Sequence, residues 1–557
     1  MENPCTIVMF GDSILKGCTN LFRQALVAAF PDRPITVVNA GVEGETSSDA
    51  LNRLDNIASQ RPDVLVIGFG MNDWRKGVDV HRFRENLHTM IDRFSEARVR
   101  VILVTMLPDY QGLGKGTSCE IPEFNSVIRQ LAEEHRLRIA DAYAFWKETM
   151  KPSWMGLSDP YHPNEKGREL LCRVLMMVVP RSKTTVLWAF DGAAVPCNYR
   201  CPYCYDQFLP SRAHRFRGSM CRWHDAFKKA FGNERLTFYI SYGEAMLSKV
   251  FLDLMEMIAS EPGWDMMMTS NISRPMGELV QTRLATEGRL NINASFHPTE
   301  TSLDRFLEQL LLLRSHGIEC PVIYVLYPPA MKPFEEYFRV FNAHGFLVHV
   351  RAYEGRWNGK TYPAGYTEEE RRMVARYADD GTIRYMLNRP PFWEIGRRSY
   401  LGMFYIYVTS AGEVVTQFFG PDEFISSRYA YGRNLGNLLE GTMKLDPLPQ
   451  PLEHTIERSV TDVACVLDVG YHELEGNFVS SFAHQGRVRR MDQGVVYPNL
   501  HLDFDDPKTR RVYGFHKTGP GPLAYLRSDT GILWTRLPHL KRHAFKKARS
   551  KLHRLLG

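Results

Sequence analysis

Thr6-Ile7-Val8-Met9-Phe10-Gly11-Asp12-Ser13 begins with β-branched and large apolar residues and ends in a glycine, an acid and a serine. The apolar run predicts a buried strand. Four large apolar residues then follow at helical spacing and predict a helix directly after the turn: Leu15, Phe22, Leu26 and Phe30. A serine at such a turn lies beside the free N–H groups of a helix start, so Ser13 is a candidate nucleophile. Gly-Asp-Ser is also common in turns and N-caps.

Three further segments of the N-terminal part carry candidate functional residues next to predicted strands or in turns. One predicted strand ends in Gly41, and another leads into Asn72. Later in the chain an acid, Asp159, precedes a histidine, His162, by three positions. Another apolar run supplies a further strand, and helical patterns separate the strands. The sequence therefore predicts a parallel sheet with crossover helices.

In this order, the four segments resemble those of SGNH (GDSL-type) hydrolases. The resemblance implies that Ser13 is the nucleophile and His162 is the base that takes its proton. It implies that Asp159 orients the imidazole. It further implies an oxyanion hole made of the Ser13 and Gly41 N–H groups and the Asn72 side-chain amide. An O-ester is the expected substrate, and a domain that binds without cleaving stays an alternative.

A cysteine triplet with C-x3-C-x2-C spacing, formed by Cys197, Cys201 and Cys204, follows the next predicted strand. Three thiolates so spaced can converge on one soft metal centre, and iron–sulfur clusters are bound by cysteine thiolates. A structural zinc site needs four ligands, and the next cysteine, Cys221, has no partner at paired spacing. The spacing favours a cluster with one iron open to a ligand. A zinc site and clustered structural cysteines are the alternatives.

The triplet resembles the signature of radical S-adenosylmethionine (SAM) enzymes. The resemblance implies one [4Fe–4S] cluster with SAM on the open iron. It also implies reductive cleavage of SAM to a radical that abstracts hydrogen from an unactivated carbon. Tyr203 is implied as a contact of the adenine. Epimerisation, dehydrogenation, rearrangement and C–C bond formation are all compatible with this chemistry.

Three predicted strand ends supply the other expected SAM contacts. Gly243 and Glu244 resemble the family's Gly-Gly-Glu strand end, which binds the methionine amino group, although Tyr242 replaces the first glycine. Asn271 and Ser295 end two later strands and are further candidates. An acid at a helix N-terminus and polar helix caps are the alternative roles of these residues.

The sequence predicts an α/β multidomain fold with four regions. A flavodoxin-like, three-layer SGNH domain is expected at 1–181, and a partial (β/α)6 radical SAM barrel at 184–360. A C-terminal α+β extension follows. It is predicted to contain a capping box of Thr367 and Glu370, a β-hairpin of 403–408 and 413–419, and a short strand at 495–502. Its first part, 361–440, lacks the cysteines for an auxiliary cluster, so one cluster is expected. Its second part, 441–557, is expected to be β-rich. It ends in a basic amphipathic helix at 536–557 that contacts an anionic surface or packs on its own domain.

Composition sets the class of protein. The chain has 557 residues, more than one hydrophobic core supports, so two or three domains are expected. A net charge of +6 gives no nucleic-acid signature, and 44% hydrophobic and 24% charged residues are typical of soluble globular proteins. The first residues resemble no signal peptide, and no apolar run is long enough to span a membrane. Ten scattered cysteines then favour reduced thiols in the cytoplasm.

These features together predict a bifunctional enzyme, a serine esterase joined to a radical SAM enzyme. The expected substrate is an acylated sugar, glycolipid or natural-product intermediate, and the expected partner is a reductant such as ferredoxin or flavodoxin. One alternative is a radical SAM enzyme whose SGNH domain binds a substrate or carrier without cleaving it. Another is a scaffold protein with a structural metal site. The oligomeric state stays open.

Overall fold

The chain divides into two compact units. The computed structural model describes residues 5–29, 34–108, 121–150, 153–180, 183–189, 197–204, 218–241, 243–318, 320–353, 355–377, 398–416, 433–451, 489–491 and 494–496. The first unit comprises Met1–Thr184, Cys221–Leu236 and Gly436–Pro449, and the second comprises Thr185–Met220, Thr237–Leu435 and Gln450–Gly557. The predicted basic helix and most of the predicted β-rich region lie outside the described residues.

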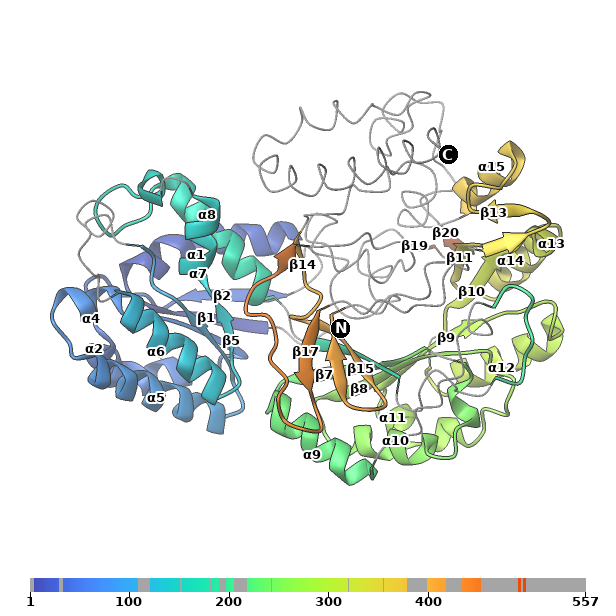
Figure 1. Cartoon of the computed structure of the whole chain (residues 1–557), viewed down its shortest axis with the longest axis horizontal. Helices are drawn as coiled ribbons and strands as arrows, with labels where there is room; N and C mark the ends of the chain where they lie inside the picture. The colour runs from blue at the N-terminus through green and yellow to red at the C-terminus, as the bar shows by residue number, and fades with distance from the viewer. Residues whose placement is uncertain are drawn as a thin grey trace, which may run out of the picture. The chain divides into compact units, whose positions relative to one another are not determined.

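A five-stranded parallel sheet forms the centre of the first unit (Figure 1). Its strands run in the order β2-β1-β3-β4-β5, and every neighbouring pair is parallel. The strands are β1 (Cys5–Gly11), β2 (Ile35–Asn39), β3 (Val64–Gly68), β4 (Arg100–Val104) and β5 (Arg138–Ala140). This is the strand order of flavodoxin-like folds, so the predicted parallel α/β sheet is confirmed.

Helices cover both faces of this sheet, with α1 and α8 on one face and α5 and α6 on the other (Figure 1). The helices of the first unit are α1 (Ser13–Ala29), α2 (Ser47–Ala50), α3 (Leu54–Ser59), α4 (Met71–Arg75), α5 (Val80–Glu96), α6 (Ile121–Glu134), α7 (Ala142–Thr149), α8 (Glu165–Val178) and α9 (Met220–Phe231). The arrangement is the three-layer one that alternating strands and helices predict.

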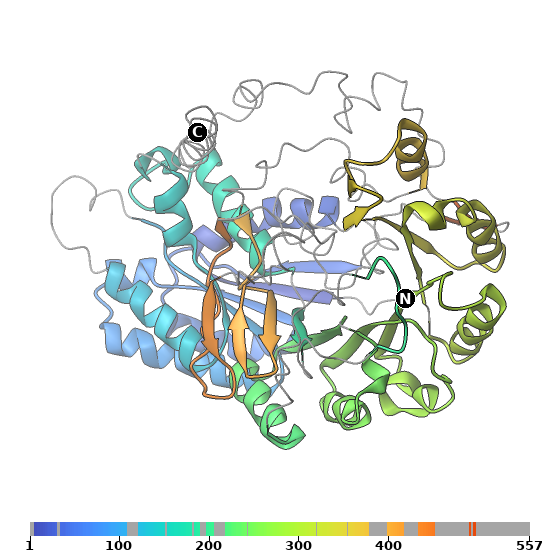
Figure 2. The ribbon, with the colours of Figure 1, turned by 45° about the vertical axis from the view of Figure 1, so that its right-hand side comes forward.

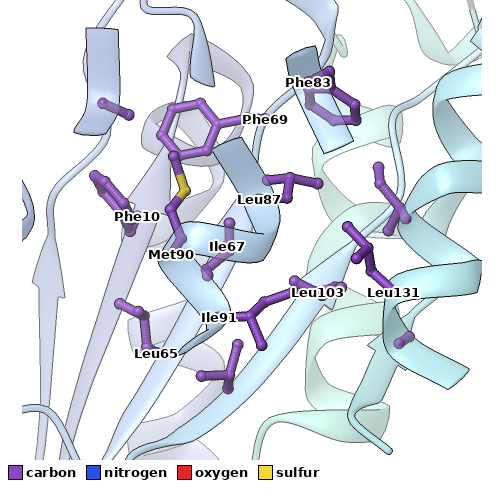
Figure 3. Close-up of a cluster of buried hydrophobic side chains, with 14 of the residues drawn as sticks. Phe10, Leu65, Ile67, Phe69, Phe83, Leu87, Met90, Ile91, Leu103 and Leu131 are labelled. Atoms are coloured by element: carbon purple, nitrogen blue, oxygen red, sulfur yellow. The ribbon is translucent and has the colours of Figure 1, made fainter. Parts of the chain in front are cut away.

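A buried apolar cluster joins the sheet to α5 and α6 (Figure 3). Alternate residues of the strands point into it because side chains of a strand alternate between its two faces. The strands contribute Phe10, Leu65, Ile67 and Leu103, α5 contributes Leu87, Met90 and Ile91, and α6 contributes Leu131. This packing fixes the ends of β1 and β3, and β1 leads directly into Ser13.

A glycine at the start of α8 gives the first prediction. A Cβ on Gly167 would lie 2.1 Å from the Gly156 carbonyl oxygen and 2.5 Å from a ring carbon of Trp146. We therefore expect Gly167→Ala to lower the free energy of unfolding by about 2–3 kcal/mol, measured by urea unfolding. The control is Gly17→Ala in α1, where a Cβ meets nothing within 4 Å. This exposed change should stabilise the chain by about 0.5–1 kcal/mol. Equal effects of the two changes would contradict the close packing of α8.

The second unit contains a nine-stranded sheet in the order β11-β10-β9-β8-β7-β6-β15-β16-β17. Six of its strands are neighbours in chain order: β6 (Lys183–Ala189), β7 (Arg235–Ile240), β8 (Trp264–Ser270), β9 (Leu290–Ser295), β10 (Val322–Leu326) and β11 (Val348–Ala352). The pairs β8–β9, β9–β10 and β10–β11 are parallel. Helices lie along the outer side of these strands (Figure 2). They include α10 (Phe251–Ala259), α11 (Arg283–Thr286), α12 (Leu303–Ser315), α13 (Pro328–Met331) and α14 (Phe334–Ala343).

The predicted partial barrel needs a correction at its first strand. The hairpin of β15 (Tyr405–Thr409) and β16 (Glu413–Val415) is present as predicted and is antiparallel. However, β15 also pairs with β6 in parallel, and β17 (Asn434–Asn437) continues the sheet beyond β16. The described sheet is therefore open and mixed, and it forms no closed barrel.

The remaining described elements are short. They are β12 (Gly355–Trp357), β13 (Lys360–Tyr362), α15 (Glu368–Tyr377), β14 (Arg398–Ser399), β18 (Gln450–Pro451), β19 (Arg489–Met491) and β20 (Gly494–Val496). The predicted strand near 495–502 corresponds to β20 in its first residues, and its remainder lies outside the described residues. In the part of the chain that the structure describes, no helix combines the length and apolar character needed to cross a bilayer.

Candidate active site

Ser13 lies where β1 passes directly into α1. The turn is tight because β1 and β3 approach each other closely: a Cβ on Gly11 would lie 2.4 Å from the Gly68 carbonyl oxygen. The Asp12 carboxylate accepts a hydrogen bond from the Ile14 N–H at 2.9 Å, which closes the turn around Ser13. The hydroxyl is thereby held at the carboxyl end of the sheet and at the N-terminal end of α1.

A hydrogen-bonded chain links the three predicted catalytic residues. Ser13 Oγ lies 3.0 Å from His162 Nε2, and His162 Nδ1 lies 2.7 Å from Asp159 Oδ2. The other Asp159 oxygen accepts the N–H groups of Tyr161 and His162, each at 2.8 Å. Partial burial raises the pKa of Asp159, but these N–H donors and the imidazole outweigh it and leave that pKa below its ordinary value. An ionised Asp159 accepts the Nδ1 proton, so His162 Nε2 is free to accept the proton of Ser13.

Asn164 fixes the loop that carries Asp159 and His162. Its side-chain amide donates to the Met155 carbonyl oxygen at 2.8 Å, and its side-chain oxygen accepts the Gly167 N–H at 3.1 Å as the N-cap of α8. One residue thus closes the histidine loop and begins the following helix. The His162 and Asp159 side chains are 41% and 45% exposed, so a substrate can reach them from solvent.

The predicted oxyanion donors are only partly brought together. The Gly41 N–H donates to Asn39 Oδ1 at 3.1 Å, so it is already engaged. The buried Asn72 amide donates to the Glu45 carbonyl oxygen at 3.0 Å, which places it against the neighbouring turn at Gly44. Gly44 has a φ of +73°, a conformation that favours glycine. The role of Gly41 stays a prediction, and the Gly44 N–H is a further candidate donor that the residue pattern did not indicate.

A buried polar network supports this turn. The Asp73 carboxylate accepts the Ser47 N–H at 3.0 Å and the Ser47 hydroxyl at 2.5 Å, and the Asn86 amide donates to that hydroxyl at 2.8 Å. Thr46 and Asp49 form a capping box at the start of α2. Its Thr-x-x-Asp pattern was visible in the sequence, whereas the partners of Asp73 are distant in sequence and gave no signal.

A small cavity of about 30 Å³ lies beside the Ser13 turn. Its lining is mainly apolar and includes Ile14, Phe69, Met106 and Leu171, together with the carboxylate of Asp12. Burial, with a smaller contribution from nearby Asp73, raises the pKa of Asp12 to about 6, and the Ile14 N–H and His162 act in the opposite direction. Asp12 therefore carries a charge at pH 7 at a cost to folding.

This cost gives a pH-dependent prediction. The folded chain holds the Asp12 proton more tightly than the unfolded chain, so stability falls as the pH rises from about 4 through 6. Asp12→Asn, whose oxygen can still accept the Ile14 N–H, should remove this fall. Relative to wild type it should stabilise the chain by on the order of 2–3 kcal/mol at pH 7.5 and by little at pH 4. Urea unfolding at both pH values measures the difference, with exposed Asp55→Asn as control. A gain that is the same at both pH values would contradict it.

The cysteine triplet lies beside the end of β8. The Asn271 amide donates to Cys197 Sγ at 3.8 Å and to Asn198 Oδ1 at 3.2 Å. Cys197 is exposed, Cys204 is half-buried and Cys201 is buried, and none of the three forms a disulfide. Burial raises the pKa of the Cys201 thiol, and Cys204, Glu300 and Cys197 raise it further. Only a nearby cation readily deprotonates such a thiol, which suits a metal ligand better than a free nucleophile.

The predicted SAM contacts fall into two groups around the triplet. Glu244 is fully buried, and its carboxylate accepts the Ser270 hydroxyl at 2.9 Å and the Asn271 N–H at 2.8 Å. Burial raises the pKa of Glu244. Glu244 stands directly before the short helical turn Ala245–Leu247, so the alternative role of an acid at a helix N-terminus stays open. The Tyr203 hydroxyl lies 2.9 Å from His297 Nδ1, and burial lowers the pKa of His297 to about 4.

Ser295 and Gly243 are the other two predicted SAM contacts. Ser295 is the last residue of β9 and pairs with Ile323 of β10. Gly243 follows β7 with a φ of +55°, in the left-handed region that favours glycine. Both stand at strand carboxyl ends, as predicted, and their roles stay predictions.

The spacing of the three thiols bears on the metal they could bind. In the described residues, the donor atoms of His88, Asp92 and His135 all lie within 4.8 Å of one another. The three cysteines do not form such a group among these residues. One zinc ion with bonds of about 2.3 Å would hold its sulfurs about 3.8 Å apart. A cluster binds each thiolate to a different iron and tolerates wider spacing. The metal that the triplet binds stays a prediction.

Similarity to known proteins covers the first unit. Residues 9–170 match the model of the GDSL-like Lipase/Acylhydrolase family. The chain is 26% identical over 171 residues to an arylesterase of Vibrio mimicus, covering 29% of this chain and 82% of that protein. It is 27% identical over 166 residues to an acetylxylan esterase of Geobacillus stearothermophilus, covering 27% and 75%. A crystal structure of the lipase/acylhydrolase from Enterococcus faecalis is 29% identical, covers 31% of this chain and 93% of that chain, and has a TM-score of 0.28. The N-terminal part of the chain is thus a GDSL-type hydrolase domain.

Proposed function

We propose that the first unit is a serine esterase that cleaves acyl O-esters, with Ser13 as nucleophile. The observation that carries the proposal is the unbroken chain from Ser13 Oγ through His162 to Asp159, with links of 3.0 and 2.7 Å. The relatives named arylesterase and acetylxylan esterase support an ester as the substrate.

The geometry supports a two-step mechanism. His162 Nε2 takes the hydroxyl proton as Ser13 Oγ attacks the ester carbonyl, and Asp159 stabilises the imidazolium that forms. His162 then gives the proton to the leaving alcohol oxygen, and the acyl group stays on Ser13. In the second step His162 removes a proton from the water that attacks the acyl-enzyme. His162 then returns this proton to Ser13 Oγ as the acid is released.

The negative oxygen of each tetrahedral intermediate needs donors on the side opposite His162. We propose the Ser13 N–H, the second hydrogen of the Asn72 amide and the Gly44 N–H for this role. Asn72 is buried and held against the Gly44 turn through Glu45, whereas the N–H of Gly41 is engaged by Asn39. Gly44 is therefore preferred over Gly41.

Removal of one such donor gives a kinetic prediction. Asn72→Ala should lower kcat by about 10²–10³-fold with little change in KM, because the lost hydrogen bond forms mainly in the transition state. Steady-state hydrolysis of an aryl acetate measures both constants. The control is Asn56→Ala, which removes an exposed amide from α3. A loss confined to KM would place Asn72 in substrate binding and remove it from the oxyanion hole.

We also propose that the second unit is a radical SAM enzyme. Cys197, Cys201 and Cys204 would bind a [4Fe–4S] cluster, which when loaded with SAM supplies hydrogen abstraction from an unactivated carbon. Support comes from the six strands in chain order and from the position of the triplet beside the end of β8. The chain's own residues orient this loop: Asn271 donates to Cys197, and Tyr203 is fixed by a neutral His297.

The two activities in one chain suggest one substrate pathway, with an acylated small molecule as the shared compound. An external reductant such as ferredoxin or flavodoxin, and a location in the cytoplasm, belong to this proposal. The alternative is that the GDSL domain holds an acylated substrate or carrier for the second unit without cleaving it. The complete Ser13–His162–Asp159 chain favours cleavage.

A further inference from the structure

Three metal-ligating side chains meet on the first unit, outside the esterase site. His88 and Asp92 are four residues apart on α5, and His135 directly follows α6. His88 Nδ1 lies 2.9 Å from Asp92 Oδ2, and His135 Nδ1 lies 3.7 Å from Asp92 Oδ1. The donor atoms of the three residues all lie within 4.8 Å of one another.

The positions of these side chains are set by two packed helices. Residues four apart on a helix lie on the same face, so His88 and Asp92 both face α6. The two imidazole rings meet edge to face, with centroids 4.8 Å apart. Arg84, one turn before His88, forms an ion pair with Glu134, the last residue of α6. This ion pair joins the two helices directly beside the three ligand side chains. Because Arg84 and Glu134 carry opposite charges, the pair adds no net charge there.

We propose that His88, Asp92 and His135 form a binding site for a divalent transition metal ion, with zinc as the first choice. Two imidazole nitrogens and one carboxylate are ligands typical of zinc and its neighbours, and unlike those preferred by magnesium or calcium. Bonds of about 2.0–2.1 Å at tetrahedral angles place donor atoms about 3.3 Å apart. The most distant pair of donors needs to approach by up to about 1.5 Å. The side chains of His88 and Asp92 are about half exposed, so rotation about their side-chain bonds can supply this approach, and water completes the coordination.

A bound ion changes the stability of the first unit and does not take part in ester hydrolysis. The cluster belongs to the layer of α5 and α6, on the opposite face of the sheet from α1 and α8 (Figure 1). Ser13 begins α1, and His162 lies in the loop before α8. A bound ion links α5 to the end of α6 and therefore stabilises the folded unit, by an amount that grows with the logarithm of the ion concentration above the Kd.

Zinc titration of the full chain tests the site. Cys197, Cys201 and Cys204 are replaced by serine in every sample, so that these thiolates cannot compete for the ion. Calorimetric titration with zinc chloride at pH 7.5 should then show one ion per chain. His135→Gln and Asp92→Asn should each weaken binding by at least about tenfold. His81→Gln, an exposed histidine on the same helix, should leave it unchanged. Binding should also weaken at pH 5.5, because the imidazoles must be neutral to bind the ion.

A second measurement distinguishes a specific zinc site from non-specific binding of zinc to the protein surface. Zinc should raise the Tm of the parent and of His81→Gln, and should not raise the Tm of His135→Gln. Unchanged ester hydrolysis by His135→Gln will show that this variant is folded. The proposal is overturned if no ion binds at one per chain, or if one still binds with equal affinity in both His135→Gln and Asp92→Asn.

Discussion

Ser13→Ala is expected to lower kcat/KM for an aryl acetate by about 10⁴-fold or more. The change removes the Oγ that lies 3.0 Å from His162 Nε2, so no acyl-enzyme can form. The oxyanion donors remain, and they account for the residual rate above the uncatalysed reaction. A fluorophosphonate should label wild type at Ser13, as found by mass spectrometry of the peptide, and should leave the variant unlabelled.

The control for Ser13→Ala is Ser59→Ala, which removes an exposed hydroxyl from α3 and should keep wild-type activity. Equal hydrolysis by wild type and Ser13→Ala would refute the serine mechanism. If wild type binds acyl esters but releases no product, the domain is a binding module and the alternative function stands.

Cys201→Ala is expected to abolish iron binding in the second unit. Cys201 is the most buried of the three thiols, so its loss leaves a gap that water cannot fill with an equivalent ligand. After anaerobic reconstitution, wild type should hold about four irons per chain and form 5′-deoxyadenosine from SAM when a reductant is added. The variant should show neither.

Cys221→Ala is the matched control for Cys201→Ala because Cys221 is an exposed cysteine outside the triplet. It should retain iron and SAM cleavage. Equal iron in Cys201→Ala and wild type would exclude the triplet as the ligand set. Zinc in place of iron in the purified chain would instead support a structural site.

The sequence indicated that Ser13, Asp159 and His162 act together because their signals are local, and the structure brings the three side chains into one hydrogen-bonded chain. Each of these predicted catalytic residues stands at a strand end or in a short turn, and parallel strands bring such ends to one edge of the sheet. The Thr367–Glu370 capping box at α15 is confirmed for the same reason: the Thr367 N–H donates to Glu370 at 2.6 Å, and Thr367 accepts the Glu370 N–H at 3.2 Å.

Contacts between distant segments could not be predicted. The engagement of Gly41 by Asn39 depends on a turn whose backbone direction the residue types do not specify. Asp73 of α4 and Ser47 of α2 lie 26 residues apart in sequence and meet only in the folded unit. The spacing of His88 and Asp92 is visible in the sequence, but His135 joins them only through the packing of α6 on α5.

The pairing of β6 with β15 has a consequence for the order in which the two units mature. The sheet of the first unit is complete once Ala140 has been synthesised, whereas Thr185 pairs with Tyr405, 220 residues later. At translation rates of about 5–20 residues per second, β6 waits roughly 10–40 s on the ribosome for that partner. During this interval its edge is open to other chains, so the nascent second unit is the part of the protein that most needs a chaperone.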